Sequence, residues 1–559
     1  MAEDNEYDVI VVGSGGGALL SAVRAHDLGM KVLVIEKSDQ YGGTSATSGG
    51  ALWIPLNGAV EDSYESAFTY MKTAAAGTTT DSKIRAYLDS AKEMIRFVND
   101  KTALRYQVST GYADYYPDVP CALDMGRAME PVPFDGALLG EEIHKLRPSH
   151  PGVTLMGIGM TIPESNVMAT KAPGWLWIVL KILFRYYLDL PWRFKTKRDR
   201  RLCLGNALIG GLRHAMLARD IPLWLNCPLE SLIREDGRVV GVIARREGRP
   251  ITLRAQRGVI LAAGGFERNQ EMRDKYLPQP SRQEWACTPK GLNTGDTIRA
   301  AEAIGARLDN MHMIWGTPTV RAPEAPQQGQ QAIFAERGFG GSVIVNQQGR
   351  RFVNETISYD RFVDAMYADH ARNGGCIPAW MVFDAKYRKN CPIGPLLPAS
   401  AMPDSKVPPE WFGDFVFKDN TLEGLARQIG VDPEGLMDSV RKNNAYAKTG
   451  VDLDFHRGES AYDRYWSICG IKPNPCLVAI DQGPYYAVRL DAGDTGTRGG
   501  PAVTEDAQVL DQGGTPISGL YCIGNNAAAP LGRVYGGAGG TIGPGMVFGY
   551  RAVNHLAQV

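Results

Sequence analysis

The most constraining feature of this chain is a strand–helix–strand pattern at its start, YDVIVVGSGGGALLSAVRAHDLGMKVLVIEKS. Residues 9–12 are β-branched and are followed by glycine, which is typical of a buried parallel strand. Gly13-x-Gly15-x-x-Ala18 then opens a helix, and KVLVIE forms a second strand that ends at Glu36. The pattern predicts an α/β fold that begins with a Rossmann-like nucleotide-binding unit.

Each small residue of the turn has a physical task. Gly13 permits the tight turn, Gly15 lets the backbone approach a pyrophosphate, and Ala18 allows the helix to pack closely on the strand. The helix N-terminus directs its positive end toward the phosphates, and Glu36 is placed to accept a hydrogen bond from a ribose hydroxyl. NAD and FAD both fit this unit.

Three further segments favour the longer cofactor. YGGTSATSGGALWIP follows Glu36 directly and is rich in glycine and hydroxyl side chains, where an NAD enzyme would normally continue its alternating sheet. RGVILAAGGFERN and GLYCIGNNAAA, far along the chain, each read as a strand that ends in small residues. We expect all of these strands to return to one sheet.

With four such segments in this order, the chain resembles the fumarate reductase/succinate dehydrogenase flavoprotein superfamily, in which they together hold FAD. The resemblance implies a discontinuous Rossmann-like FAD-binding domain with an inserted α+β substrate-capping domain. Covalent members attach the flavin to a histidine in the second glycine loop, and residues 42–50 contain none, so we expect FAD to be bound non-covalently. The implied cofactor-binding residues are Gly13, Ser14, Gly15, Gly16, Gly17, Ala18, Glu36, Lys37, Gly43, Thr44, Ser45, Ser48, Gly49, Gly50, Ala263, Gly264, Gly265, Asn525 and Gly543.

Four other stretches are similar to the 3-ketosteroid Δ1-dehydrogenases of this superfamily: GYADYYPDVP, RFVNETISYDRF, GTRGG and VYGGAGG. The resemblance implies that Tyr359 is the base that removes a proton from C2 of ring A, with Tyr115 as its supporting hydroxyl. It also implies that a hydride passes from C1 to flavin N5. Spacing alone does not choose among Tyr112, Tyr115 and Tyr116, and the alignment of ADYY to the family favours Tyr115.

The chemistry of the reaction explains the tyrosine beside the glycine run at residues 533–545. A proton next to a ketone becomes acidic only when the carbonyl oxygen is stabilised as it gains charge, and each fixed donor contributes about 3–4 kcal/mol. We assign this role to the Tyr535 hydroxyl and the Gly539 N–H. An ordinary phenol titrates at about 10, so a neighbouring hydroxyl or a cation must stabilise the anionic form of the base.

Other functions remain open at this stage. A 3-ketosteroid Δ4-(5α)-dehydrogenase would use the same cofactor, although the VYGGAGG and GTRGG patterns favour Δ1 chemistry. A fumarate-reductase-like enzyme would need an arginine clamp that the sequence does not display. A non-catalytic sterol carrier that retains FAD belongs to a different class. The sequence leaves open the steroid side chain and the electron acceptor, a quinone or another molecule.

Residues 174–201, GWLWIVLKILFRYYLDLPWRFKTKRDRR, form an unusual insertion. Its apolar stretch of roughly 15 residues is shorter than the ~20 needed to span a bilayer. On a helix ended by Pro191, the apolar residues fall on one face, and a basic segment follows. Coinciding apolar, tryptophan and basic signals predict peripheral attachment to a membrane surface, whereas the alternative is a core helix followed by a solvated loop.

Composition narrows the remaining classes. A formal net charge of −1 gives no case for nucleic-acid binding. Nine scattered cysteines without a C-x-x-C pair argue against a disulfide framework and against a metal site. The acidic N-terminus runs straight into a strand, so we expect no signal peptide and a cytoplasmic protein attached to the cytoplasmic membrane.

The motifs also predict how the chain is divided. Residues 1–110, 202–290 and 489–559 are expected to form the FAD-binding domain. Residues 111–201 form a substrate-side segment that carries Tyr115 and the insertion. Residues 291–488 form the catalytic or capping domain, in which Asp432-Pro433 is suited to start a helix.

Overall fold

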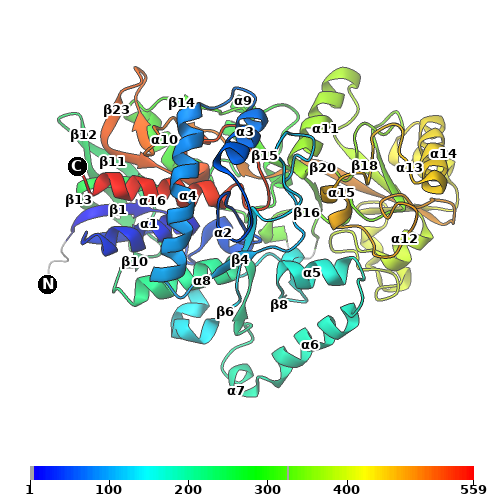
Figure 1. Cartoon of the computed structure of the whole chain (residues 1–559), viewed down its shortest axis with the longest axis horizontal. Coiled ribbons are helices and arrows are strands. Elements are labelled where there is room, and N and C mark those ends of the chain that lie inside the picture. The colour runs from blue at the N-terminus through cyan, green and yellow to red at the C-terminus, as the bar shows by residue number, and fades with distance from the viewer. Residues whose placement is uncertain (1–4, 324–325) are drawn as a thin grey trace.

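The computed structural model describes residues 5–323 and 326–559, which fold around two large β-sheets (Figure 1). The first sheet, with its helices, lies on the left of Figure 1, and the second lies on the right. The mixed α/β class predicted from the sequence is confirmed.

The first sheet joins segments that are far apart in the sequence. Strand β1 pairs in parallel with β2 and with the end of β13, and β13 pairs in parallel with β23. The expectation that these strands return to one sheet is therefore confirmed. The strands of this sheet are β10 (Leu223–Trp224), β2 (Val32–Ile35), β1 (Glu6–Val12), β13 (Arg249–Leu261), β12 (Arg238–Arg246), β11 (Leu229–Glu235), β23 (Pro516–Cys522) and β22 (Gln508–Leu510).

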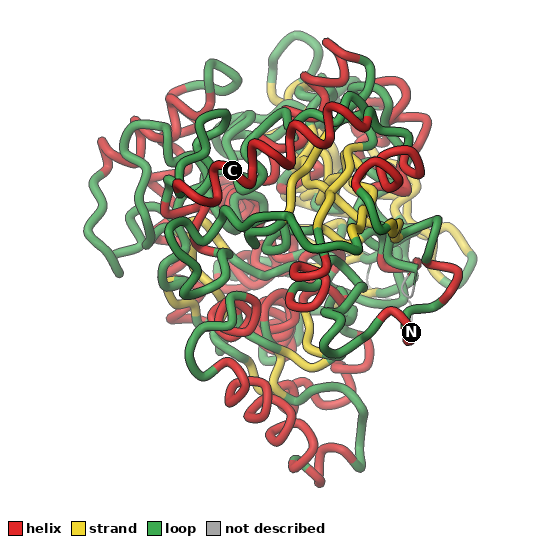
Figure 2. Tube along the Cα trace, turned by 90° about the vertical axis from the view of Figure 1, so that its right-hand side faces the viewer, coloured by secondary structure: helices red, strands yellow, loops and turns green. Residues whose placement is uncertain are grey.

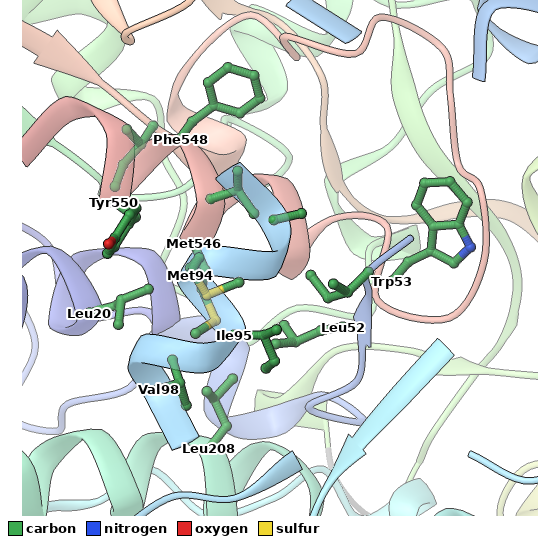
Figure 3. Packing of buried hydrophobic residues seen from close by; sticks show 14 of the residues in the cluster. Leu20, Leu52, Trp53, Met94, Ile95, Val98, Leu208, Met546, Phe548 and Tyr550 are labelled. Atoms are coloured by element: carbon green, nitrogen blue, oxygen red, sulfur yellow. The ribbon is translucent and has the colours of Figure 1, made fainter. Parts of the chain in front are cut away.

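Helices cover this sheet, in which β2 and residues 9–12 of β1 are apolar and buried. Helix α1 (Gly16–Asp27) packs against α16 (Ile542–Leu556) and α8 (Leu204–Leu217), and α16 in turn contacts α4 (Asp81–Lys101). Figure 3 shows the resulting core, where Leu20, Met94, Leu208 and Met546 meet from these four helices. The last helix of the chain thus anchors the glycine run that precedes it.

The second sheet is mainly antiparallel, and its strand β20 passes through the middle. The expected domain boundary at residue 489 falls inside β20, which continues pairing with β15 as far as Thr497. The strands are β16 (Gln331–Ala332), β15 (Ile314–Val320), β20 (Tyr485–Thr497), β18 (Ala379–Phe383) and β17 (Ser342–Val345), with β19 (Val416–Asp419) paired to β20.

The remaining strands and helices surround or connect the two sheets. The remaining strands are β3 (Leu52–Trp53), β4 (Tyr106–Val108), β5 (Ala128–Pro131), β6 (Phe134–Asp135), β7 (Thr154–Leu155), β8 (Ile158–Gly159), β9 (Arg201–Leu202), β14 (Leu308–Asp309) and β21 (Gly500–Pro501). The remaining α-helices are α2 (Gly43–Thr47), α3 (Tyr64–Ala75), α5 (Ile162–Ala169), α6 (Trp175–Leu188), α7 (Leu190–Arg193), α9 (Gln270–Tyr276), α10 (Asp296–Ala303), α11 (Tyr359–Asn373), α12 (Ala385–Asn390), α13 (Leu422–Ile429), α14 (Pro433–Thr449) and α15 (Ala461–Tyr465). Asp432 caps the N-terminus of α14 as predicted, because its side chain accepts the N–H groups of Glu434 and Gly435.

Helices α6 and α7 project from the lower edge of the molecule in both views (Figures 1 and 2). The prediction that Pro191 ends the long helix is wrong. Helix α6 ends at Leu188, and Pro191 lies in the first turn of α7. The N–H group that proline lacks is not needed there, because N–H groups in the first turn have no partner within the helix. None of the described helices is both long and apolar enough to cross a membrane.

Candidate active site

A cavity of about 490 Å³ extends from the β1–α1 turn to a cluster of tyrosines. Its wall combines residues from the first sheet, from α2, from α5 and from the region around β16. Most of the residues predicted to bind the cofactor lie in this wall: Gly13, Ser14, Gly15, Gly16, Gly17, Ala18, Glu36, Lys37, Gly43, Thr44, Ser45, Ser48, Gly49, Gly50, Ala263, Gly264 and Asn525.

At one end of the cavity, the N-terminus of α1 is open to a ligand. The N-cap residue Gly15 has no side chain and so supplies no cap of its own; the Gly16 N–H is taken by the Ser45 hydroxyl at 3.1 Å. Gly13 has a φ of 110°, and a Cβ there would lie 2.5 Å from the Ala262 carbonyl oxygen. Only glycine permits this approach of the turn to the end of β13, and it leaves the helix terminus free for a phosphate.

A hydrogen-bond network holds Glu36 at the end of β2. One carboxylate oxygen accepts the Ser14 hydroxyl at 2.6 Å, and the other accepts the Ser38 N–H at 2.9 Å. The Ser14 hydroxyl also accepts the N–H of Gly42 at 2.9 Å, which ties the two glycine loops together. The carboxylate therefore has a fixed position in the cavity wall.

The second glycine loop forms the short helix α2 and then an extended segment. The Ser45 hydroxyl accepts the Gly16 N–H at 3.1 Å, so α2 lies against the start of α1. Gly50 has a φ of 62°, and a Cβ there would lie 2.4 Å from the Leu204 carbonyl carbon. The close packing of α8 against this segment therefore requires glycine at position 50.

Two of the predicted cofactor-binding residues lie outside the cavity wall. A Cβ at Gly265 would meet the Thr497 hydroxyl at 2.2 Å, and one at Gly543 would meet the Tyr87 hydroxyl at 3.1 Å. Both positions allow the backbone to pack closely against a neighbouring side chain.

The sequence reading missed the loop at residues 292–297, which lines the same end of the cavity. The Asn293 amide donates to the Thr44 hydroxyl at 2.7 Å and to the Glu267 carboxylate at 2.6 Å. Lys37 donates to Asp296 at 2.9 Å. The small and polar run GLNTGDT before a helix is a signal that could have identified this loop.

At the other end, three tyrosines from distant segments form a hydrogen-bonded chain. Tyr359 donates to the Tyr535 hydroxyl at 2.7 Å and shares a hydrogen bond of 3.0 Å with Tyr115. All three are buried and line the cavity, together with Gly539. The structure thus brings together the four residues to which sequence reasoning assigned the chemistry.

The neighbouring tyrosines have different surroundings. Tyr112 also lines the cavity and packs beside Tyr115, with 6.3 Å between the ring centroids. Tyr116 lies outside the wall, where its hydroxyl donates to Asp360 at 2.5 Å and accepts the Tyr535 N–H at 3.1 Å. Tyr116 therefore fixes the backbone of Tyr535.

The glycine run after Tyr535 packs directly against β3. A Cβ at Gly536 or Gly537 would lie 2.6 or 2.4 Å from the Trp53 ring, which is labelled at the right of Figure 3. Gly539 has a φ of 92°, and a Cβ there would lie 2.3 Å from the Ala51 backbone. In the described chain no acceptor takes the Gly539 N–H, so this donor is available to the cavity.

Burial dominates the electrostatics of the tyrosine cluster. It raises the pKa of Tyr115, Tyr359 and Tyr535 above the ordinary phenol value, and the negative charge that a neighbouring phenol would carry adds to the effect for Tyr115 and Tyr359. The three groups are therefore neutral in the free site at neutral pH. A neutral Tyr535 keeps the proton that it needs in order to donate a hydrogen bond.

The nucleotide end of the cavity fits FAD. The open helix terminus suits a pyrophosphate, Glu36 suits a ribose hydroxyl, and the extended segment at residues 48–50 continues the wall toward the tyrosines. NAD, which the first unit also fits, would not need this second loop.

Comparison with known proteins agrees with this geometry. The model of a family described as "FAD binding domain" matches residues 8–542. The chain is 40% identical to a 3-oxosteroid 1-dehydrogenase of Comamonas testosteroni, over 99% of this chain and 96% of that protein. A 3-oxosteroid 1-dehydrogenase of Mycobacterium tuberculosis is 38% identical, over 99% and 98% of the two chains.

This chain belongs to the 3-oxosteroid 1-dehydrogenase family of FAD-binding proteins. The crystal structure of a 3-ketosteroid Δ1-dehydrogenase from Sterolibacterium denitrificans, in complex with 1,4-androstadiene-3,17-dione, is 52% identical to it. That structure superposes with a TM-score of 0.96 and covers 99% of this chain and 100% of the other. The family and its FAD-binding fold are those implied by the sequence motifs.

The turn at Gly13 provides a direct test of the cofactor end. Gly13→Ala should abolish most FAD retention, because the added Cβ would collide with the Ala262 carbonyl oxygen in a left-handed conformation. The measurement is the ratio of flavin to protein absorbance after purification, together with the thermal unfolding temperature. Gly29→Ala is the matched control, since Gly29 has a φ of 82° with nothing within 4 Å of its Cβ position. Equal flavin content in the two variants would contradict the assignment.

Proposed function

We propose that this chain is an FAD-dependent dehydrogenase that converts 3-keto-4-ene steroids to 3-keto-1,4-dienes by removing hydrogen from C1 and C2 of ring A. The observation that carries the proposal is the convergence of the Tyr535 hydroxyl, the Gly539 N–H and the Tyr359 hydroxyl in one cavity beside the FAD-binding loops. Membership of the 3-oxosteroid 1-dehydrogenase family supports the steroid as substrate.

Two donors bind the C3 carbonyl oxygen in this proposal. The Tyr535 hydroxyl is neutral and buried, and the Gly539 N–H has no acceptor in the described chain. Both are held rigidly, so they require little reorganisation as negative charge develops on the oxygen. Each contributes about 3–4 kcal/mol to stabilising the enolate-like transition state.

Tyr359 then removes the C2 proton. Its hydroxyl lies between those of Tyr535 and Tyr115, so it is placed next to the bound ketone and has a partner that can accept or return a proton. FAD, when bound, accepts the hydride that leaves C1. We further propose that FAD is held non-covalently, because residues 42–50 offer no histidine to it.

The wall around the substrate end supports a steroid over a dicarboxylate. Its lining includes Met160, Ile162, Phe334, Phe339 and Trp466, and no arginine of the described chain belongs to it. A fumarate-reductase-like activity would need cationic groups there to bind two carboxylates. The Δ4-(5α)-dehydrogenase alternative differs in which bond of ring A is oxidised, C4–C5 instead of C1–C2.

Anaerobic mixing of the yellow protein with a 3-keto-4-ene steroid tests the proposal. The flavin absorbance should bleach, and the product should be the 1,4-diene. Tyr359→Phe should slow bleaching by about 100- to 10,000-fold, because the base is lost. Tyr535→Phe should slow it by about 100- to 1,000-fold, because one carbonyl donor is lost.

Tyr462→Phe is the matched control for these variants. Tyr462 is a buried phenol that packs on Tyr115 at 5.2 Å but does not line the cavity, so its rate should stay within about threefold of the parent. Bleaching by 5α-saturated steroids alone would establish the Δ4 alternative. A flavin that no ketosteroid bleaches would favour the sterol-carrier reading and refute the enzyme.

We also propose that α6 and α7 attach the chain to a membrane surface. Members of the apolar stripe predicted for a helix here face solvent: Leu176 is 58% exposed, Phe184 55% and Leu188 70%. Trp177 and Phe194, outside the predicted stripe, are 66% and 89% exposed. Ile182 on the opposite side is fully buried and holds the helix to the body of the protein. Soluble proteins rarely leave such a patch uncovered.

The charges around this surface refine the proposal. Lys181, Lys195 and Lys197 are exposed, whereas Arg201 pairs with Glu164 at 2.9 Å and Arg198 donates to backbone carbonyls. The lysines are therefore the charges available to anionic lipids. Helix α5, which immediately precedes α6, lines the cavity through Ser165 and Ala169, so attachment would bring the steroid entrance close to the lipid.

This attachment would place the protein on the cytoplasmic side of the cytoplasmic membrane. A membrane-soluble quinone, or another acceptor, could then reoxidise the cofactor, and steroids that retain their side chain could enter from the lipid. The membrane location, the acceptor and the route of steroid entry are all inferred from the exposed apolar surface of α6 and α7, and the following experiment tests that surface.

The triple variant Trp177→Ser, Leu180→Ser, Phe184→Ser should lower binding to phosphatidylglycerol–phosphatidylethanolamine vesicles by more than about tenfold, because apolar area that enters the interface is lost. Vesicle co-sedimentation measures the effect, and turnover of a dissolved steroid should be unchanged. Leu453→Ser, at a residue 73% exposed elsewhere on the surface, is the control. Unchanged sedimentation of the triple variant would refute membrane attachment.

A further inference from the structure

Arg337 is a buried cation close to the tyrosine cluster. Its side chain is among the largest fully buried ones, and all of its hydrogen bonds go to backbone carbonyls. Nε donates to the Ile333 oxygen at 3.0 Å, and Nη1 donates to the oxygens of Glu355 at 2.7 Å and Ile357 at 3.1 Å. The guanidinium forms no salt bridge with any carboxylate at residues 5–323 or 326–559.

The other buried charges beside it balance one another. Arg351 binds the carboxylates of Glu355 and Asp452 at 2.6 and 2.7 Å, and Arg457 lies 3.5 Å from Glu355. These two arginines and two acids sum to zero. The positive charge of Arg337 is therefore not cancelled within this group, and a buried guanidinium remains protonated.

The remaining charged groups around the tyrosines are also accounted for. Asp360 accepts from Tyr116 at 2.5 Å and lies 3.8 Å from Arg498. Asp463, like Arg337, has no salt bridge in the described chain, and its carboxylate accepts N–H groups from Gly458 and the Asn354 amide. Glu336 accepts the Gly394 N–H at 3.3 Å, and burial raises the pKa of its carboxyl, which favours its neutral form. Arg337 is thus the cation left without a carboxylate partner.

Arg337 is connected to Tyr359 through the backbone. The carbonyls of Glu355 and Ile357 lie in the turn that leads into α11, whose first residue is Tyr359. Phe334, from the same segment as Arg337, packs on the Tyr359 ring with 4.9 Å between centroids. Burial lowers the pKa of Arg337, whereas Tyr462, Glu336 and Tyr359 raise it when they carry negative charge, so the guanidinium and the phenols are within electrostatic reach.

We propose that Arg337 is a positioning residue whose positive charge stabilises the anionic form of Tyr359 and so allows this phenol to accept the substrate proton. The inference rests on the role proposed above for Tyr359. The N-terminus of the 15-residue helix α11 acts in the same direction, because Tyr359 lies at its positive end. Arg337 supplies the cation that a tyrosine base requires and that the sequence motifs did not identify.

The sign of the pH effect follows directly. Only the phenolate form of Tyr359 accepts a proton, so the rate should rise with pH as this form becomes more abundant. Because burial raises the pKa of Tyr359, the rise occurs at higher pH than for an ordinary phenol. A nearby cation moves this rise to lower pH. Removing the cation should move it to higher pH by about one to two units, which lowers the rate at neutral pH by about 10- to 100-fold.

The experiment measures anaerobic flavin reduction against pH for the parent, Arg337→Gln and Arg337→Lys. The Gln variant keeps hydrogen-bond donors for the carbonyls but loses the charge, so its profile should shift to higher pH with partial recovery of the rate at alkaline pH. The Lys variant keeps the charge but loses the forked contact, so its rate should stay within about threefold of the parent. Affinity for the 1,4-diene product should change little in either variant.

Arg268→Gln is the matched control, because Arg268 is a buried arginine that also donates to backbone carbonyls, those of Gln283, Ala286 and Thr288, outside the turn that leads into α11. It should lower thermal stability without moving the pH profile. A Gln variant that is slower at every pH with an unshifted profile would refute the proposal. Should that variant fail to fold, the Lys variant decides, since a loss of rate there would show that the forked contact matters and the charge does not. If Tyr359→Phe itself retains full rate, the base assignment fails instead.

Discussion

Close packing of the glycine run at residues 536–539 against β3 is the constraint on which the active site depends. The Trp53 ring and the Ala51 backbone occupy the space where side chains at these positions would lie. This contact brings the last segment of the chain against the loop that follows β2, and it places Tyr535 in the wall of the cavity that the cofactor-binding loops also line. Helix α16 holds the arrangement through its packing with α1 and α4.

The tyrosine chain extends this constraint across the two sheets. Tyr535 follows the last strand of the first sheet, and Tyr359 begins a helix packed on the second sheet. Tyr115 comes from the loop between β4 and β5. Their hydrogen bonds of 2.7 and 3.0 Å exist only when all three segments are correctly placed. Burial keeps the phenols neutral, which suits the donor role proposed for Tyr535 and would make Tyr359, as the proposed base, dependent on positive charge from its surroundings.

The sequence was sufficient for features that local physics or a motif determines. Glycines 13 and 15 with Glu36 predicted the first unit, and the four strand segments return to one sheet as expected. Features that depend on long-range packing were not accessible. Gly265 carries the same motif signal as Gly264 but packs on Thr497, and no sequence motif marks Arg337, although it donates to the backbone carbonyl of Ile357, two residues before Tyr359. The boundary expected at residue 489 could not reveal that β20 continues to Thr497.

The proposed mechanism requires that Tyr535 and Gly539 bind the ketone oxygen of ring A while Tyr359 faces C2. A crystal structure of this chain with FAD and a 1,4-diene-3-one steroid tests it most directly. In that complex the C3 oxygen should lie within about 3 Å of both the Tyr535 hydroxyl and the Gly539 N–H, and the Tyr359 hydroxyl should lie next to C2. A steroid bound in the opposite direction, with ring A away from these donors, would contradict it.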